Sequence, residues 1–205
     1  MAYVLEPLTG ESLPRAPSVC FDCVFWQARA GRPVAKPAWI ERVEGDWGAW
    51  GTLYRDEGGR LLGFMQYAPA AYFPRAFELP AGPPSEDAML VTCAYLVDPS
   101  TPWVMQSLFL SAIGDARDRN IKAIEAFGYR YPEGTAAHDR FLVHRTVFPS
   151  DFLADFGFAV VRAEGSVELA RLELGGLVPV MDSRLSHLVR RAKDLLAPTP
   201  VPERN

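Results

Sequence analysis

Cys20 and Cys23 have the C-x-x-C spacing that is found at metal-binding sites. A C-x-x-C pair supplies half of a zinc site and needs two further ligands, for which Cys93 and either His138 or His144 are available. No second pair in the sequence has the spacing of a zinc site. We therefore expect the two cysteines to be small buried residues beside their aromatic neighbours, and we expect no bound metal.

His138 and His144 flank Arg140 in the polar stretch 131–145. One of them could act as a base or contact a substrate, but two solvated imidazoles in a surface loop are the favoured interpretation. The sequence contains no G-x-S-x-G, H-E-x-x-H or Walker motif. It therefore gives no support to a serine hydrolase, a zinc peptidase or a nucleoside triphosphatase.

The composition is that of a globular protein. The chain has 205 residues, a formal net charge of −4 and 49% hydrophobic residues, which suits one domain with a full-sized core. Nucleic-acid binding needs a basic surface, so the net acidity does not favour it. No apolar run approaches the roughly 20 residues of a membrane helix, and the N-terminus lacks the features of a signal peptide. Three cysteines are too few for a disulfide scaffold, so we expect a cytoplasmic protein. For the reasons just given, we expect no nucleic-acid partner and no membrane partner.

Two β-rich runs, 50–55 and 60–67, are separated by the turn sequence 56–59, which predicts a hairpin. Further elements predicted from the hydrophobic pattern are strands at 3–8, 158–162 and 167–174 and helices at 38–43 and 149–156. The aromatic residues before segment 89–97 are expected to be core, or else to line an apolar pocket: Trp47, Trp50, Tyr54, Phe64, Tyr67, Tyr72 and Phe73.

Segment 89–97 is apolar on both faces, as expected of a central strand covered on both sides. Helix 103–119 follows it, with Thr101 as the N-cap and Pro102 as the first helical residue. Segment 121–127 is then a second strand. A strand–helix–strand unit of this kind favours a parallel crossover, so we predict an α/β fold with a mixed sheet.

In this order of elements, residues 3–174 resemble the GNAT superfamily of acyl-CoA-dependent N-acyltransferases. The resemblance is carried by the segments GRLLGFMQYAP, LVDP and DFLADFGF. It implies acetyl-CoA or another acyl-CoA as co-substrate, held where the central strand ends and the next helix begins. Helix N-termini attract anions such as pyrophosphate. The implied cofactor contacts are Tyr95, Leu96, Val97, Pro102, Trp103, Val104, Met105, Gln106 and Ser107.

The phosphate-binding loop of that superfamily has the pattern V-x-P-x-x-[QR]-x-x-G-x-[GA]. Val97 and Pro99 match the pattern, whereas Pro102, Met105 and Ser107 stand where Gln or Arg, Gly, and Gly or Ala are expected. The chain therefore resembles a divergent member with a degenerate loop. We expect the long side chain of Met105 to occupy the space that glycine leaves for phosphate.

The superfamily often uses a tyrosine as the general acid, at the position of Leu153 in this chain. Leucine cannot donate a proton, so the resemblance implies a substitute. We expect Glu125 to be the general base and Tyr129 the general acid, with Glu86 and Asp87 as alternative bases.

The sequence predicts a GNAT-like N-acetyltransferase domain over 1–176 and a C-terminal helical extension over 177–205. Within the extension we expect an amphipathic helix at 182–196 with a solvated basic face, or else one that packs on a second subunit as a homodimer contact. The predicted function is transfer of an acetyl or other short acyl group to a small-molecule or protein amine. The alternative is a catalytically inactive GNAT-fold module for ligand binding or protein interaction.

Overall fold

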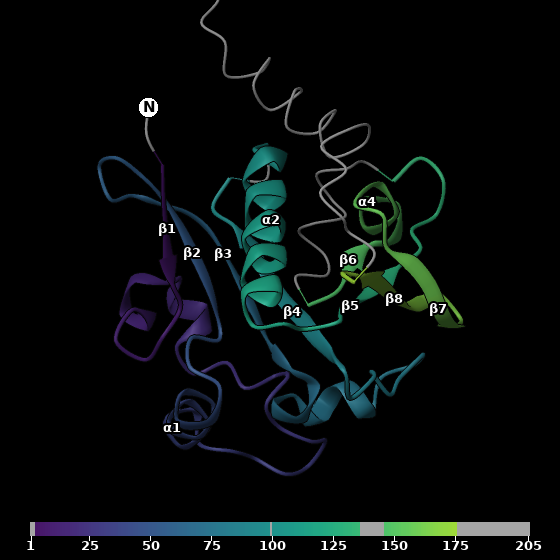
Figure 1. The fold of residues 1–205 in the computed structure, drawn as a ribbon, viewed down its shortest axis with the longest axis horizontal. Helices are drawn as coiled ribbons and strands as arrows, with labels where there is room; N and C mark the ends of the chain where they lie inside the picture. Colours follow the sequence, from purple (N-terminus) through teal and green to yellow (C-terminus); the bar gives the residue numbers. More distant parts are fainter. Residues whose placement is uncertain (1–2, 99, 136–145, 176–205) are drawn as a thin grey trace, which may run out of the picture. The chain divides into compact units, whose positions relative to one another are not determined.

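The computed structural model describes residues 3–98, 100–135 and 146–175 (Figure 1). Pro99, both histidines of the polar stretch 131–145 and the predicted C-terminal helix lie outside the described residues. The boundary predicted at residue 176 therefore stays a prediction.

The described residues form a mixed sheet, as predicted, and this sheet has eight strands. The order of the strands is β1-β2-β3-β4-β5-β8-β7, and β6 pairs with β5 off this path. The strands are β1 (Tyr3–Pro7), β2 (Gly51–Asp56), β3 (Leu61–Pro69), β4 (Ala88–Leu96), β5 (Ala123–Tyr129), β6 (Phe148–Pro149), β7 (Ala159–Glu164) and β8 (Val167–Glu173). The helices are α1 (Lys36–Asp46), α2 (Pro102–Asp118) and α4 (Ser150–Asp155), with 3-10 turns η1 (Leu13–Arg15), η2 (Ser18–Cys20), η3 (Ala70–Tyr72) and η4 (Pro74–Phe77).

The predicted β2–β3 hairpin, the β7–β8 hairpin and the parallel pairing of β4 with β5 are all confirmed. Thr101 is the N-cap of α2, as predicted, but its hydroxyl accepts no hydrogen bond from a helix N–H; it donates to the Asp98 carbonyl oxygen at 2.6 Å. The two-residue strand β6 was not predicted.

Helix α2 covers one face of the sheet across β2, β3 and β4 (Figure 1). Gly63 of β3 allows the close approach, because a Cβ there would lie 2.9 Å from the Val104 side chain and 2.7 Å from the Tyr95 carbonyl oxygen. Helix α4 packs on the same face, where Phe109 of α2 meets the ring of Phe148 at 5.0 Å and the ring of Phe152 at 5.5 Å.

The opposite face of the sheet is covered by α1 and the N-terminal turns. Three of the seven aromatic residues predicted to be core are buried here: Trp50, Phe64 and Phe73. Trp39 of α1 packs against Trp50 at 5.1 Å and against Phe73 at 5.9 Å. The same face includes Leu90 of β4 and Phe127 of β5, which places both central strands between two packed layers.

Strands β4 and β5 pair over only part of their length. The parallel ladder joins Ala88–Val91 to residues 123–126 and then stops. Immediately beyond it, Thr92 is an extra residue opposite β3, because Val91 pairs with Tyr67 and Cys93 pairs with Gln66. A bulge of this kind bends a strand and increases its twist, so β4 turns away from β5 at this point.

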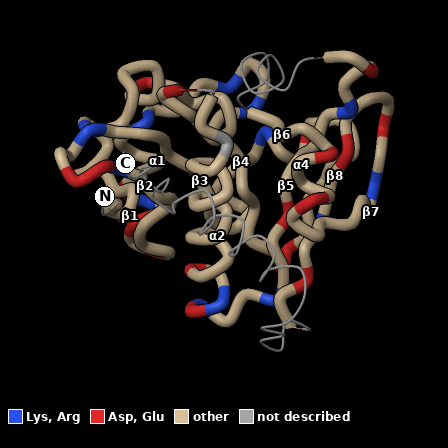
Figure 2. The backbone as a smooth tube through the Cα atoms, turned by 90° about the horizontal axis from the view of Figure 1, so that it is seen from above, with Lys and Arg blue, Asp and Glu red and all other residues tan. Residues whose placement is uncertain are grey.

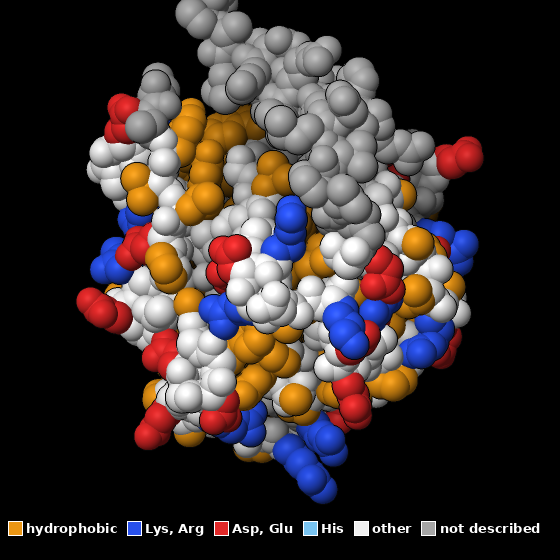
Figure 3. Space-filling model, in the orientation of Figure 1, with side chains coloured by type: hydrophobic (Ala, Val, Ile, Leu, Met, Phe, Trp, Pro, Cys, Tyr) orange, Lys and Arg blue, Asp and Glu red, His pale blue; other side chains and the backbone are white. Residues whose placement is uncertain are grey.

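Charges of both signs are interspersed over the side of the molecule drawn in Figure 3. Within the described residues, no helix combines the length and the apolarity needed to cross a membrane.

Candidate functional site

Beyond its bulge, β4 has one paired edge and one edge that meets no described strand. The backbone N–H of Val97 donates to the Leu62 carbonyl oxygen of the β3 side at 2.9 Å. Hydrogen-bonded pairs alternate along an antiparallel ladder, so Tyr95 also directs its backbone groups to β3, whereas Ala94 and Leu96 direct theirs to the opposite edge. Of the predicted backbone contacts at 95–97, only Leu96 therefore faces the open edge, and Ala94 is an additional residue that sequence reasoning missed.

Strand β6 pairs with β5 beyond the point where the pairing of β4 with β5 ends. Gly128 pairs with Glu168 of β8 and with Phe148 of β6, so β8 and β6 lie on opposite edges of β5. A Cβ on Gly128 would lie 2.8 Å from the Ser150 hydroxyl oxygen, so the start of α4 packs closely over this strand. Leu153, at the family's tyrosine position, is buried in α4.

The open edge of β4 leads to the N-terminus of α2, where the resemblance places pyrophosphate. The Asp98 carboxylate accepts hydrogen bonds from the Ser100 N–H at 2.9 Å and from its hydroxyl at 2.6 Å. The turn before α2 is thus held by its own side chains, and it places one carboxylate beside the end of the helix that attracts anions.

Met105 is buried in the core beneath α2, with 2% of its surface exposed. Our expectation that its side chain fills the phosphate space is therefore wrong, because the helix turns this residue toward the sheet. Val104 is also buried, and the half-buried Trp103 packs on Tyr3 with ring centres 5.1 Å apart. Gln106 and Ser107 are half-buried; the Ser107 hydroxyl donates to the Trp103 carbonyl oxygen at 3.0 Å.

Glu125, the predicted base, is fully buried on the α1 face of β5. Its carboxylate accepts hydrogen bonds from the Ser85 N–H at 2.7 Å, the Ser85 hydroxyl at 2.6 Å and Nη1 of Arg171 at 3.1 Å. Arg171 also binds Asp87 at 3.0 Å and Glu173 at 2.6 Å. These hydrogen bonds lower the pKa of Asp87. The structure thus brings Glu125 together with the alternative base Asp87, in one network that is already paired.

Tyr129, the predicted acid, is half-buried at the end of β5, where it pairs with Pro149 of β6. Its ring meets the ring of Tyr131 edge-on, with centres 4.9 Å apart. Glu86 is exposed before β4. The structure does not bring Tyr129 into the Glu125 network, so the roles of the two residues as an acid–base pair stay a prediction.

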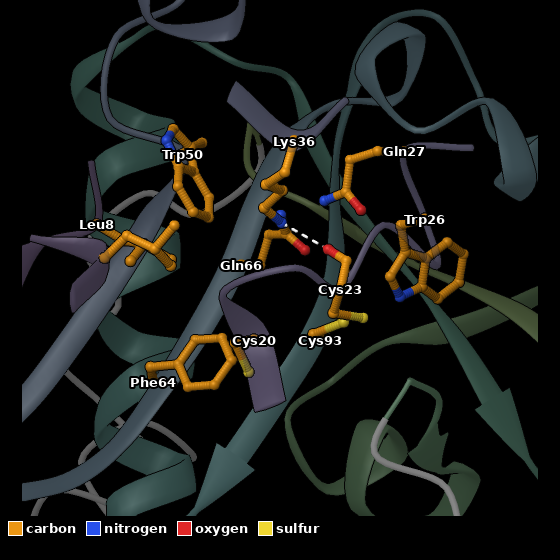
Figure 4. A pocket seen from close by; sticks show the side chains of 11 residues that line it. Leu8, Cys20, Cys23, Trp26, Gln27, Lys36, Trp50, Phe64, Gln66 and Cys93 are labelled. Atoms are coloured by element: carbon orange, nitrogen blue, oxygen red, sulfur yellow. Dashed lines mark hydrogen bonds between the residues drawn. The ribbon is translucent and has the colours of Figure 1, made fainter. Parts of the chain in front are cut away.

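All three cysteines of the chain line one cavity on the α1 face of the sheet (Figure 4). Cys20 ends η2, Cys23 follows it, and Cys93 lies on β4 next to the bulge. The expected burial is wrong for Cys23, which is exposed. Burial raises the pKa of the Cys93 thiol. Within the described ranges, no three His, Cys, Asp or Glu side chains are placed to hold a metal ion.

Two side chains of this cavity, Lys36 of α1 and Gln66 of β3, were not predicted to be functional. Lys36 is 8% exposed, and its ammonium donates to the Cys23 carbonyl oxygen at 2.8 Å while lying 5.1 Å from the Trp39 ring centre and 5.3 Å from that of Trp50. Burial lowers its pKa. The signal available in the sequence was a lysine at the start of a helix, which is too common to single out.

A comparison with models of protein families found no match, and a comparison with curated proteins found none either. Solved structures with a similar fold include the PaiA N-acetyltransferase of Thermoplasma acidophilum in complex with coenzyme A (15% identity, TM-score 0.49, 84% of this chain and 99% of that chain). They also include the ribosomal-protein-S18-alanine N-acetyltransferase of Escherichia coli (10%, 0.45, 84% and 94%) and a GCN5-related N-acetyltransferase of Kribbella flavida (14%, 0.47, 84% and 98%). Each of these three alignments covers 84% of this chain, at an identity of 15% or less.

Proposed function

We propose that this protein transfers an acetyl or other short acyl group from acyl-CoA to a primary amine, by direct attack of the neutral amine on the thioester. The observation that carries the proposal is the open edge of β4. It begins at the bulge of Thr92, presents the backbone of Ala94 and Leu96, and ends at the start of α2.

These backbone groups suit the extended arm of an acyl-CoA. Ala94 and Leu96 would each offer one N–H and one C=O to its amides, as a neighbouring strand would. An N–H at this edge would also donate to the thioester carbonyl and stabilise the negative charge that develops on its oxygen. The positive end of the α2 dipole would attract the pyrophosphate, although Pro102 has no N–H to donate and the Val104 N–H already donates to the Thr101 carbonyl oxygen at 3.0 Å. Coenzyme A supplies the thioester whose carbonyl carbon is attacked.

Two side chains are proposed to transfer protons, one as the general acid and one as the general base. Tyr129 is on the strand that diverges from β4, and we keep it as the general acid. Glu125 would act as a base only if Ser85 and Arg171 released its carboxylate. The acceptor is proposed to be a small-molecule or protein amine. None of the three cysteines, all of which lie in the described residues, forms a disulfide, which suits the cytoplasmic location predicted from the sequence.

The first experiment is calorimetric titration of acetyl-CoA into the full chain and into a Gln106→Glu variant. A carboxylate in the first turns of α2 favours the helix itself but repels a bound pyrophosphate, so we expect micromolar binding that weakens about tenfold. Met105 is unsuitable for this purpose, because a charge at a buried position would unfold the helix.

Lys122→Gln is the matched control, since it lowers the net charge by the same amount at an exposed residue before β5, at the opposite end of β4. Equal binding by all three proteins would place any CoA site away from α2. Absence of binding for acetyl-CoA and longer acyl-CoAs would refute the proposal and leave the alternative, a non-catalytic binding module.

A further inference from the structure

The cavity lined by the cysteines is surrounded by hydrogen-bond donors. Two buried amide N–H groups on its walls have no hydrogen-bond partner among the described residues: Gln27 Nε2 and Gln66 Nε2. The two residues are each 4% exposed. Buried polar groups are normally paired, because an unpaired one costs about 1–3 kcal/mol, so two around one cavity need an explanation.

Lys36 adds a positive charge to these donors. Figure 4 shows the ends of Lys36, Gln27 and Gln66 turned toward one another, with the Trp26 indole nitrogen facing the cysteine sulfur atoms. Among the described residues, no carboxylate forms an ion pair with Lys36, whose ammonium has only the Cys23 carbonyl and two tryptophan rings as partners. A buried cation of this kind calls for an anion.

The cavity measures about 30 Å³, which is room for a group of two or three heavy atoms. Water molecules in this space could accept hydrogen bonds, but they bring no negative charge for Lys36. A carboxylate has two oxygens with about four acceptor positions and brings the missing negative charge. The remainder of a ligand would extend toward solvent on the side of the exposed Cys23.

The cavity also lies next to the proposed site of reaction. Gln66 and Cys93 form the pair that follows the bulge of Thr92, and the next residue of β4, Ala94, faces the open edge.

We propose that this cavity binds a carboxylate group, with Lys36 as its charge partner and the amides of Gln27 and Gln66 as donors. The proposal rests on the acyltransferase function for its second part, which is that the carboxylate belongs to the acceptor, an amino acid or a close analogue. The other source of the same chemistry is the free carboxylate of a dicarboxylic acyl group such as succinyl.

The test is ligand-observed NMR on the full chain without coenzyme A, using acetate, glycine and ethylamine as probes. We expect acetate and glycine to bind and ethylamine, which lacks the carboxylate, to bind at least about tenfold more weakly. Lys36→Met removes a charged donor and Gln66→Glu removes a neutral one. In each variant, binding of acetate should therefore fall about tenfold or more. Lys122→Met, at an exposed site, should bind as the parent chain does.

Gln66→Glu preserves the size of the side chain and gives Lys36 a carboxylate partner, so it keeps the test valid if Lys36→Met fails to fold. Equal acetate binding in Gln66→Glu and the parent chain, or no preference for acetate over ethylamine, would overturn the proposal. Acetate binding without acyl-CoA binding would uphold the cavity and refute acyl transfer.

A second pair of measurements distinguishes a carboxylate that belongs to the acceptor from one that belongs to the acyl group. If the acceptor carries it, the parent chain should acetylate glycine faster than ethylamine, and Gln66→Glu should remove that preference. If instead the parent chain binds succinyl-CoA more tightly than acetyl-CoA, and only this preference disappears in Gln66→Glu, the amino-acid acceptor is refuted and the cavity is assigned to the acyl group.

Discussion

Two polar clusters lie on the same face of the central sheet and differ in how completely their members are paired. Around Glu125, donors and acceptors match: Ser85 and Arg171 donate to its carboxylate, and Asp87 and Glu173 take the other N–H groups of Arg171. Around Lys36 the pairing is incomplete: the Cys23 carbonyl oxygen accepts from the ammonium, whereas the amide N–H groups of Gln27 and Gln66 have no partner among the described residues. Figure 2 shows charges of both signs near β5 and β8, where the paired cluster lies.

The difference bears on the roles of the two clusters. A buried network whose hydrogen bonds are all made rigidifies the fold and offers nothing to a ligand. A cluster with unmatched donors is costly to the protein alone, and the cost is recovered when a ligand supplies the acceptors. The sequence singled out Glu125 as the general base, but the completed hydrogen bonds of its cluster indicate that this cluster stabilises the fold.

The largest expected effect is that of removing Arg171 from the paired cluster. Arg171→Met would leave the Glu125 carboxylate buried without its cation, and we expect the free energy of unfolding to fall by about 3–5 kcal/mol. Chemical denaturation measures it. The double variant Arg171→Met/Glu125→Leu removes both charges and should recover most of the loss. A loss of under 1 kcal/mol in the single variant would show that the network is not what holds these strands.

A change of opposite sign is expected in the unpaired cluster. Gln66→Leu removes a buried amide donor that has no partner, so we expect the free energy of unfolding to be unchanged or to rise by about 1 kcal/mol. Thr92 loses one acceptor but retains the backbone carbonyl oxygen of Gln66 at 3.3 Å.

The matched variant is Ser85→Ala, which removes a made hydrogen bond to Glu125 and should destabilise by about 1–2 kcal/mol. Denaturation of both variants under the same conditions gives the comparison directly. If Gln66→Leu destabilises as much as Ser85→Ala does, the Gln66 amide is satisfied in solution and the contrast between the two clusters fails.

The sequence was sufficient to predict the elements but not the sites. Periodicity and turn residues placed the β2–β3 hairpin, β4 and α2 to within a few residues, because those signals are local. Strand β6 was missed since two residues, Phe148 and Pro149, carry no periodicity of their own.

The two clusters could not be predicted because their members come from distant parts of the chain. Arg171 is 46 residues from Glu125, and Lys36 reaches the cavity from a helix 30 residues before Gln66. Bringing them together depends on the strand order, which places β8 beside β5 and α1 over β3. The local pattern that did stand out in the sequence, Cys20 and Cys23, lies on the lining of the same cavity.

The smallest effect is expected at the rim of the paired cluster. Hydrogen bonds from Arg171 lower the pKa of Asp87, a residue whose side chain is 47% exposed. A carboxyl with a lowered folded-state pKa stabilises the fold above its unfolded pKa of about 3.9, and this contribution is lost as pH falls through the folded-state value. Solvent screens the pair, so Asp87→Asn should cost at most about 1 kcal/mol at pH 7.

The difference in stability between the parent chain and Asp87→Asn should be smaller at pH 2 than at pH 7, because protonation of Asp87 removes the charge that Arg171 stabilises. Thermal unfolding at the two pH values measures the difference. Repeating the substitution in the Arg171→Met background should abolish the effect at pH 7, since the partner is gone. A difference that is as large at pH 2 as at pH 7, or that persists in that background, would show that Asp87 acts independently of Arg171, and the paired cluster would then end at Glu125 and Ser85.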